Sequence, residues 1–208
     1  ASDNVTIAIN QLPNVNAGPD NEICFGEQIQ LNASGAMNYE WSPNTDLNNS
    51  SIGNPLFSGG ITTTLSVTGI DSNGCVNTDD VIVTVNQLPL ISAGSDEEIC
   101  FGDSIQLGAS GALTYVWSPN LSLSNSTIFN PIFSGETTTT LTVTGADANG
   151  CVNTDEVTIS VNQLPAINAG ADQAICEGES AQLEAIGNGS FIWFPGGSLS
   201  SPVIANPV

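Results

Sequence analysis

A 76-residue repeat runs through the chain and restricts, more than any other feature, what the chain can fold into. The tripeptide Gln-Leu-Pro occurs at positions 11–13, 87–89 and 163–165. Aligning residues 11–86 with 87–162 leaves about two-thirds of the positions identical without a gap, and the third copy is more diverged. Self-similarity at such a period indicates small structural units stacked along one chain.

The repeat boundaries predict two whole domains, at residues 14–89 and 90–165, flanked by two fragments. Residues 1–13 match the end of a copy, so we expect them to be the last strand of a preceding repeat followed by a linker. Residues 166–208 match the first half of a further, more diverged copy. We therefore expect the natural chain to extend beyond both ends of this sequence.

Within one repeat, apolar residues recur with a period of two. Leu65 and Val67 alternate with Thr64 and Ser66, and short turn signals such as the Asn-Gly pair at 73–74 separate runs of this kind. Such alternation is typical of half-buried strands. The sequence predicts an all-β fold of tandem immunoglobulin-like antiparallel β-sandwiches with a 76-residue repeat. The expected core anchors are Trp41, Trp117 and Trp193.

The charge composition excludes several classes of function. The 208 residues include 21 Asp and Glu but no Lys, Arg or His, which gives a formal net charge of −21. Neutralising nucleic-acid phosphates requires Lys or Arg, so we expect no nucleic-acid partner. An anionic membrane would repel this surface, and no apolar run reaches the roughly 18 residues that span a bilayer, so we expect no direct membrane contact.

The five cysteines follow the repeat and suggest disulfides in an oxidising, extracellular setting. We expect Cys24 to pair with Cys75 and Cys100 with Cys151, each bridge clipping one end of a small domain. The fifth, Cys176, would then find its partner outside this sequence. Two alternatives remain open at this point: buried reduced thiols, and a bond between Cys75 and Cys100 across the domain boundary.

The motifs carry a resemblance to a known family. In order they are Ala-Gly-x-Asp-x-x-Ile-Cys, Gln-Leu-x-Ala-x-Gly, Tyr-x-Trp-Ser-Pro and Asp-x-Asn-Gly-Cys-x-x-Thr-Asp. This order resembles the tandem immunoglobulin-like, PKD-related repeats of large cell-surface adhesins in Bacteroidetes. The resemblance implies a place in the stalk of a secreted adhesin, including gliding-motility adhesins exported by the type IX secretion system. The third copy departs from the pattern, with Glu177 where the first has Phe25.

We expect no enzymatic activity. The acidic groups recur at the repeat period, whereas an active site usually occurs once. Asp79 and Asp80, like Asp155 and Glu156, are neighbours on a strand and would point to opposite faces, which is poor geometry for a carboxylate pair that must flank one bond.

Calcium is the one ligand that the acidic composition favours, because hard cations take oxygen ligands from Asp, Asn and backbone carbonyls. An Asx-stabilised turn explains the same residues equally well. We expect no other cofactor. The candidate calcium ligands are Asp71, Asn73, Asp147 and Asn149 in the turns, and Asp20 and Asp96 after the linkers. The tripeptide Asp103-Ser104-Ile105 also fits a short O-glycosylation pattern, which makes Ser104 a candidate modification site.

The combined prediction is the structural shaft of a long extracellular adhesin or surface filament, located at the cell surface. Each domain would add roughly 30–40 Å, from strands of about ten residues at about 3.3 Å each plus the linker. The expected partners are further copies of the repeat in the same chain, lateral copies in a filament, and a surface or glycan ligand bound at a separate tip. The alternative is an accessory carbohydrate-binding or spacer module of a secreted enzyme.

Overall fold

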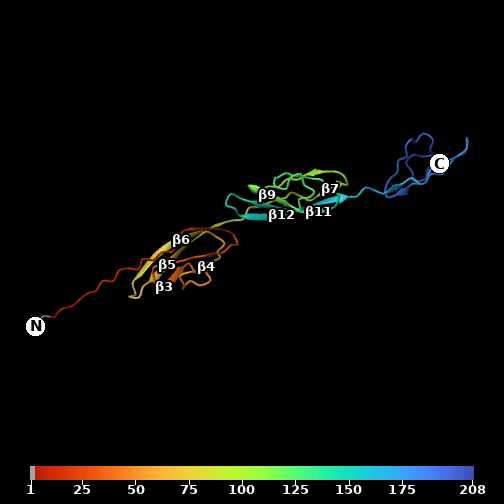
Figure 1. Ribbon diagram of the computed structural model, residues 1–208. Coiled ribbons are helices and arrows are strands. Elements are labelled where there is room, and N and C mark those ends of the chain that lie inside the picture. Colours follow the sequence, from red (N-terminus) through yellow and green to blue (C-terminus); the bar gives the residue numbers. More distant parts are fainter. Residues whose placement is uncertain (1–2) are drawn as a thin grey trace.

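The computed structural model describes residues 3–208, and its regular elements in that range are all β-strands. Figure 1 shows two elongated domains arranged end to end, followed by a smaller unit at the C-terminal side. The strands of the first domain are β1 (Asn21–Cys24), β2 (Ile29–Gln30), β3 (Asn38–Ser42), β4 (Leu56–Phe57), β5 (Thr63–Ile70) and β6 (Val76–Asn86). Those of the second domain are β7 (Glu97–Cys100), β8 (Ile105–Gln106), β9 (Thr114–Ser118), β10 (Ile132–Phe133), β11 (Thr139–Ala146) and β12 (Val152–Asn162).

Each domain is a sandwich of one four-stranded and one two-stranded sheet. In the first domain the strand order of the large sheet is β1-β6-β5-β3, and β2 pairs with β4 to form the small sheet. The second domain repeats this arrangement as β7-β12-β11-β9 and β10-β8. The prediction of tandem immunoglobulin-like β-sandwiches is confirmed.

The two domains have separate cores that place the same side chains at equivalent positions. Trp41 and Trp117 are each 1 % exposed, and Phe57 and Phe133 are fully buried. A buried indole needs a hydrogen-bond acceptor; Trp41 Nε1 donates to the carbonyl of Ile52 at 2.9 Å, and Trp117 makes the equivalent bond.

One strand in each domain departs from the expected antiparallel pattern. β1 runs parallel to β6, and Cys24 lies opposite Asn86 at the C-terminal end of β6. Cys75 directly precedes β6 and therefore lies at its other end. An eleven-residue strand at about 3.3 Å per residue spans about 35 Å. The two cysteines of one domain consequently lie at opposite ends of the sandwich.

The terminal segments contribute little regular structure. Residues 3–13 belong to no strand; residues 1 and 2, which the sequence assigns to the same expected strand, lie outside the described residues. Residues 166–208 contain only β13 (Ile167–Asn168) and β14 (Ile186–Gly187), which pair with each other. Trp193, expected as a core anchor, is only half-buried here, although its Nε1 still donates to the carbonyl of Ile204 at 2.9 Å.

Candidate functional site

The most distinctive site is the junction of the two domains, where a disulfide joins Cys24 to Cys151. Their Cα atoms are 5.6 Å apart, within the usual range for a disulfide, and the bond spans 127 positions. The expected pairs Cys24–Cys75 and Cys100–Cys151 are wrong. They fail because β1 runs parallel to β6, which places Cys24 at the end of its domain that faces the next repeat.

Cys24 is presented to the second domain by a tight turn, which we call the cysteine turn (residues 24–27, with equivalents at 100–103 and 176–179). The N–H of Glu27 donates to the Cys24 carbonyl at 3.0 Å, and a Glu27 carboxylate oxygen accepts the Cys24 N–H at 2.9 Å. Gly26 has φ +90, a conformation that only glycine adopts readily. The chain therefore turns back sharply at this point and leaves Cys24 at the tip of the domain.

Cys151 sits at the end of a second turn, which we call the acidic hairpin turn (residues 147–151, with its equivalent at 71–75). Asp147 Oδ1 accepts the N–H groups of Asn149 and Cys151, both at 2.9 Å. The Asp147 N–H in turn donates to the Cys151 carbonyl at 3.0 Å. The Asp-x-Asn-Gly motif thus builds an Asx-type turn that positions the cysteine.

The same geometry bears on the calcium prediction. Asp71 Oδ1 accepts the N–H groups of Asn73 and Cys75, both at 2.8 Å, as Asp147 does in the second domain. The other two candidates, Asp20 and Asp96, accept the backbone N–H groups of Ile82 and Thr158, each at 2.8 Å. Among residues 3–208, no three acidic, cysteine or histidine side chains cluster closely enough to hold a metal ion. Calcium binding stays a prediction.

The linker between the domains is fastened on both sides. Gln87 Nε2 donates to the carbonyl of Gly60 in the first domain at 3.1 Å. The carbonyl of Pro89 accepts a hydrogen bond from Asn153 Nδ2 in the second domain at 3.0 Å. Proline also restricts the linker backbone. Few linker torsions are therefore free to let one domain swing relative to the other.

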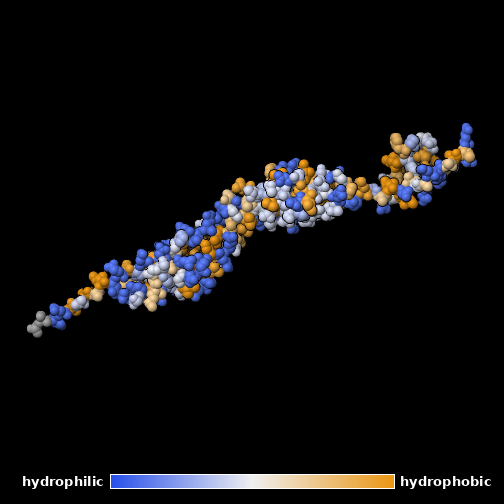
Figure 2. All heavy atoms as spheres, in the orientation of Figure 1, coloured by the Kyte–Doolittle hydropathy of each residue, from blue (hydrophilic) through white to orange (hydrophobic). Residues whose placement is uncertain are grey.

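Apolar side chains complete the junction. A cavity of about 320 Å³ lies between the domains. Figure 2 shows hydrophobic atoms gathered where the first domain meets the second. The cavity is lined by Cys24, Phe25, Gly26, Glu27 and Leu88 from the first domain and its linker, and by Gly150 and Val152 from the second. The acidic hairpin turn of the second domain therefore covers the cysteine turn of the first.

The remaining cysteines are unpaired in the described part of the chain. They are Cys75, which is half-buried, and Cys100 and Cys176, which are both exposed. The alternative bond between Cys75 and Cys100 is also absent, because these residues lie at opposite ends of the two-domain unit. Ser104, the candidate glycosylation site, is exposed in the loop that follows the second cysteine turn.

Sequence reasoning missed the role of Asp79 and Asp155. Asp79 Oδ2 accepts the N–H of Ala17 at 2.8 Å, and Asp155 Oδ2 accepts the N–H of Ala93 at 2.9 Å. Backbone N–H groups of Ala93 and Glu156 lower the pKa of Asp155 below its ordinary value of 3.8. Each carboxylate fastens the segment that enters its domain to the longest strand. The recurrence of this aspartate at the repeat period was the available signal.

No protein-family model and no curated protein matches the chain. Among solved structures, the insect immune protein hemolin is similar, with 14% identity and a TM-score of 0.42 over 77% of this chain and 49% of that chain. DIP-gamma IG1+IG2 is similar with 10% identity and a TM-score of 0.36 over 72% of this chain and 98% of that chain. Sidekick-1 immunoglobulin domains 1–5 give 12% identity and a TM-score of 0.33 over 74% of this chain and 40% of that chain. The chain spans about half the length of hemolin.

Residues 3–208 include no helix of the length and apolar character that crossing a bilayer requires.

Proposed function

We propose that this chain is part of the structural shaft of an extracellular adhesin or surface filament, in which stacked immunoglobulin-like domains hold a binding tip away from the cell. The observation that carries the proposal is the junction, where a disulfide, a fastened linker and an apolar contact all join the same two domains. Three connections at one boundary restrict movement between the two domains. A shaft that transmits force or keeps its length requires this restriction, whereas a protein that only carries its domains in sequence does not.

The position of the bridge supports this role further. Cys24 and Cys151 lie on separate domains, so pulling on the two ends of the chain loads the disulfide together with the linker. Disulfides persist in oxidising surroundings, which agrees with a location outside the cell. The acidic surface, without a basic residue, disfavours nucleic acid and anionic lipid as partners.

The finer assignment rests on the sequence resemblance. We place the shaft among the large cell-surface adhesins of Bacteroidetes, with export by the type IX secretion system and a role in adhesion that includes gliding motility. The repeats themselves act without enzymatic chemistry, and further repeats of the same chain are their immediate neighbours. Lateral association of shafts into a filament belongs to the same proposal.

Deletion of residues 90–165 from the full-length surface protein tests this function. Both the distance of a labelled tip from the cell, by electron microscopy, and adhesion to the natural surface are measured. A shaft predicts a tip closer by roughly 30–40 Å, one domain of about ten-residue strands plus its linker, with adhesion retained. Normal export with unchanged tip distance, or adhesion abolished although the protein reaches the surface, would contradict a shaft and favour a binding module.

A further inference from the structure

Within residues 3–208, Cys75 and Cys100 form no disulfide, yet each repeats the position of a cysteine in the Cys24–Cys151 bond. Cys100 is the second-domain equivalent of Cys24, and Cys75 is the first-domain equivalent of Cys151. Both lie at the outer ends of the two-domain unit, away from the junction.

The backbone of the turn at Cys100 matches that of the bonded turn at Cys24, although among the described residues Asp103 does not accept the Cys100 N–H as Glu27 accepts that of Cys24. The N–H of Asp103 donates to the Cys100 carbonyl at 3.0 Å, as Glu27 does to Cys24. Gly102 has φ +88, and the N–H of Phe101 donates to the Asn162 carbonyl at 2.8 Å, the same distance as Phe25 to Asn86. Cys100 is therefore already held in the backbone conformation that forms the disulfide.

The turn at Cys75 matches the bonded turn at Cys151. Asp71 Oδ1 accepts the Cys75 N–H at 2.8 Å, and the Asp71 N–H donates to the Cys75 carbonyl at 3.1 Å. Gly74 has φ +79 against +82 for Gly150. The acidic hairpin turn at the N-terminal end of the first domain therefore already has the conformation in which its equivalent contacts the cysteine turn.

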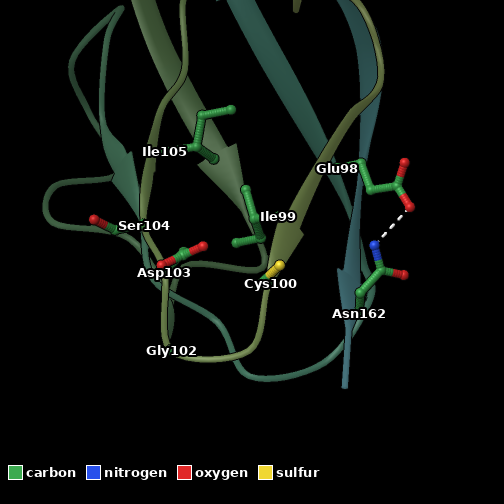
Figure 3. Close-up of a pocket in the computed structure, with 8 residues that line it drawn as sticks. All are labelled: Glu98, Ile99, Cys100, Gly102, Asp103, Ser104, Ile105 and Asn162. Carbon is green, nitrogen blue, oxygen red and sulfur yellow. Dashed lines mark hydrogen bonds between the residues drawn. The ribbon is translucent and has the colours of Figure 1, made fainter. Parts of the chain in front are cut away.

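The surface around Cys100 shares three positions with the junction cavity, where Cys100, Gly102 and Asp103 repeat Cys24, Gly26 and Glu27. A cavity of about 530 Å³ surrounds it, and Figure 3 shows the Cys100 sulfur where β7 ends, beside the Asp103 loop and the hydrogen-bonded pair Glu98 and Asn162. At the junction, the equivalent surface around Cys24 is covered by Gly150 and Val152 of the next domain. Among residues 3–208, the cavity at Cys100 is lined by second-domain residues alone, with no hairpin turn over it.

The exposure of each cysteine side chain differs between bonded and unbonded positions in the way that contact with a neighbouring domain predicts. Cys151 is fully buried at the junction, whereas its unbonded equivalent Cys75 is half-buried. Cys24 is half-buried, whereas its unbonded equivalent Cys100 is exposed. The contact with a neighbouring domain accounts for both differences.

We propose that Cys100 is the disulfide site for the acidic hairpin turn of the following repeat and that Cys75 is the site for the cysteine turn of the preceding one. This inference rests on the proposed shaft of consecutive repeats. The bonded pair is 127 positions apart, so the partner of Cys100 lies 127 positions after it and the partner of Cys75 lies 127 positions before it. Cys176 follows the same rule one repeat later. Every junction then carries one bridge, and each whole repeat is bonded to both neighbours.

The bond forms by an ordinary oxidation. The Cys100 thiol and its partner thiol lose two protons and two electrons, and a sulfur–sulfur bond forms between them. The electrons pass to the disulfide of a thiol–disulfide oxidant, which is cleaved to two thiols.

A chain with one added repeat tests the proposal. A second copy of residues 90–165 is inserted after Pro165, so that the second domain has a following domain with a complete hairpin. The inserted copy carries Ala148→Thr at an exposed position of the turn, which gives its hairpin peptide a mass different from those of both original hairpins. The protein is refolded with oxidised and reduced glutathione and digested without reduction, using a protease that cuts at acidic residues because trypsin has no site.

We expect Cys100 linked to the marked hairpin peptide and Cys24 linked to the unmarked one. Cys100→Ser in the original second domain should free the marked cysteine and raise the thiol count by one. The matched control Cys75→Ser should lower the thiol count by one and leave both bridges intact. The Cys24 bridge reports correct folding in every sample.

A digest in which Cys24 is bridged to its unmarked partner while Cys100 stays a free thiol, or pairs with any other cysteine, overturns the inference. That result would leave the shaft proposal standing, since tip distance and adhesion test it separately.

Discussion

At the scale of single residues, two aspartates hold the entry segment of each domain in place. Asp79 and Asp155 accept backbone N–H groups from Ala17 and Ala93, residues that lie 62 positions earlier in the chain. Hydrogen bonds to an ionised carboxylate are stronger than neutral ones. Because the chain has no basic residue, backbone N–H groups bind these carboxylates, a role that Lys or Arg side chains have in most proteins.

The pKa of Asp155 predicts an acid-sensitive contribution to stability. A carboxyl whose folded pKa is lowered below its ordinary value stabilises the fold above that ordinary value. The contribution is then lost as the pH falls from about 4 through the lower folded value. We expect the stability difference between the wild-type protein and Asp155→Asn, measured by urea unfolding, to be constant near pH 7 and to shrink below about pH 4.

Asp103→Asn is the matched control, because the Asp103 carboxylate accepts no hydrogen bond in the described part of the chain. Its stability at pH 7 should equal that of the wild-type protein, because the substitution removes no hydrogen bond to a carboxylate. An Asp155→Asn difference that stays constant from pH 7 down to pH 2 would show that the ionised carboxylate contributes nothing.

At the scale of the elements, a glycine in the central strand of each large sheet lets the entry segment pack closely. Gly145 lies on β11, and a Cβ there would overlap the side chains of Ile91 and Ala112. Gly69 on β5 stands in the same relation to Val15 and Ala36. The glycine therefore makes room for a core side chain that arrives from outside the sheet.

We expect Gly145→Ala to lower the free energy of unfolding of the second domain by about 1–3 kcal/mol, the usual effect of overpacking a core. Gly108→Ala is the control, since nothing lies within 4 Å of the position of its Cβ and the first repeat has Asn32 there. Chemical denaturation of both variants measures the difference. Equal stability of the two variants would argue against close packing at Gly145.

At the scale of the whole molecule, the junction joins two domains that otherwise have separate cores. The bridge links Cys24 to Cys151, while Cys75 carries no bond in the structure. The effect of removing a bonded cysteine can therefore be compared with the effect of removing an unbonded one.

We expect Cys24→Ser to lower the stability of the chain by about 2–4 kcal/mol, and to broaden the distribution of maximum dimensions in small-angle X-ray scattering. Cys75→Ser should change neither quantity. Identical scattering profiles for the two variants would mean that the linker contacts alone set the geometry of the junction.

The charge of the whole chain predicts a response to cations. With a net charge of −21, self-repulsion weakens the compact state, and any ion bound only to the native form raises its stability. The calcium hypothesis predicts a larger rise in melting temperature with CaCl₂ than with NaCl at equal ionic strength. Equal rises would show that charge screening alone explains the stabilisation and would contradict specific calcium binding.

The sequence by itself determined the repeat, the strands and the residues of the two main cores. These properties are local or periodic: alternation with a period of two identifies strands, and an identical offset of 76 residues identifies equivalent positions. The burial of Trp41 and Trp117 follows from the same pattern. The half-buried state of Trp193 does not, because its burial depends on strands that the third copy lacks here.

Only the tertiary structure decided which cysteines meet. A bridge within a domain would join cysteines 51 positions apart and the observed bridge joins cysteines 127 positions apart, but both patterns recur every 76 residues, so periodicity cannot distinguish them. The direction of β1 determines which pair forms. Because β1 runs parallel to β6, Cys24 lies at the end of its domain that faces the next domain, about one strand length from Cys75. Strand direction depends on long-range pairing between residues about 60 positions apart, and local sequence does not encode it.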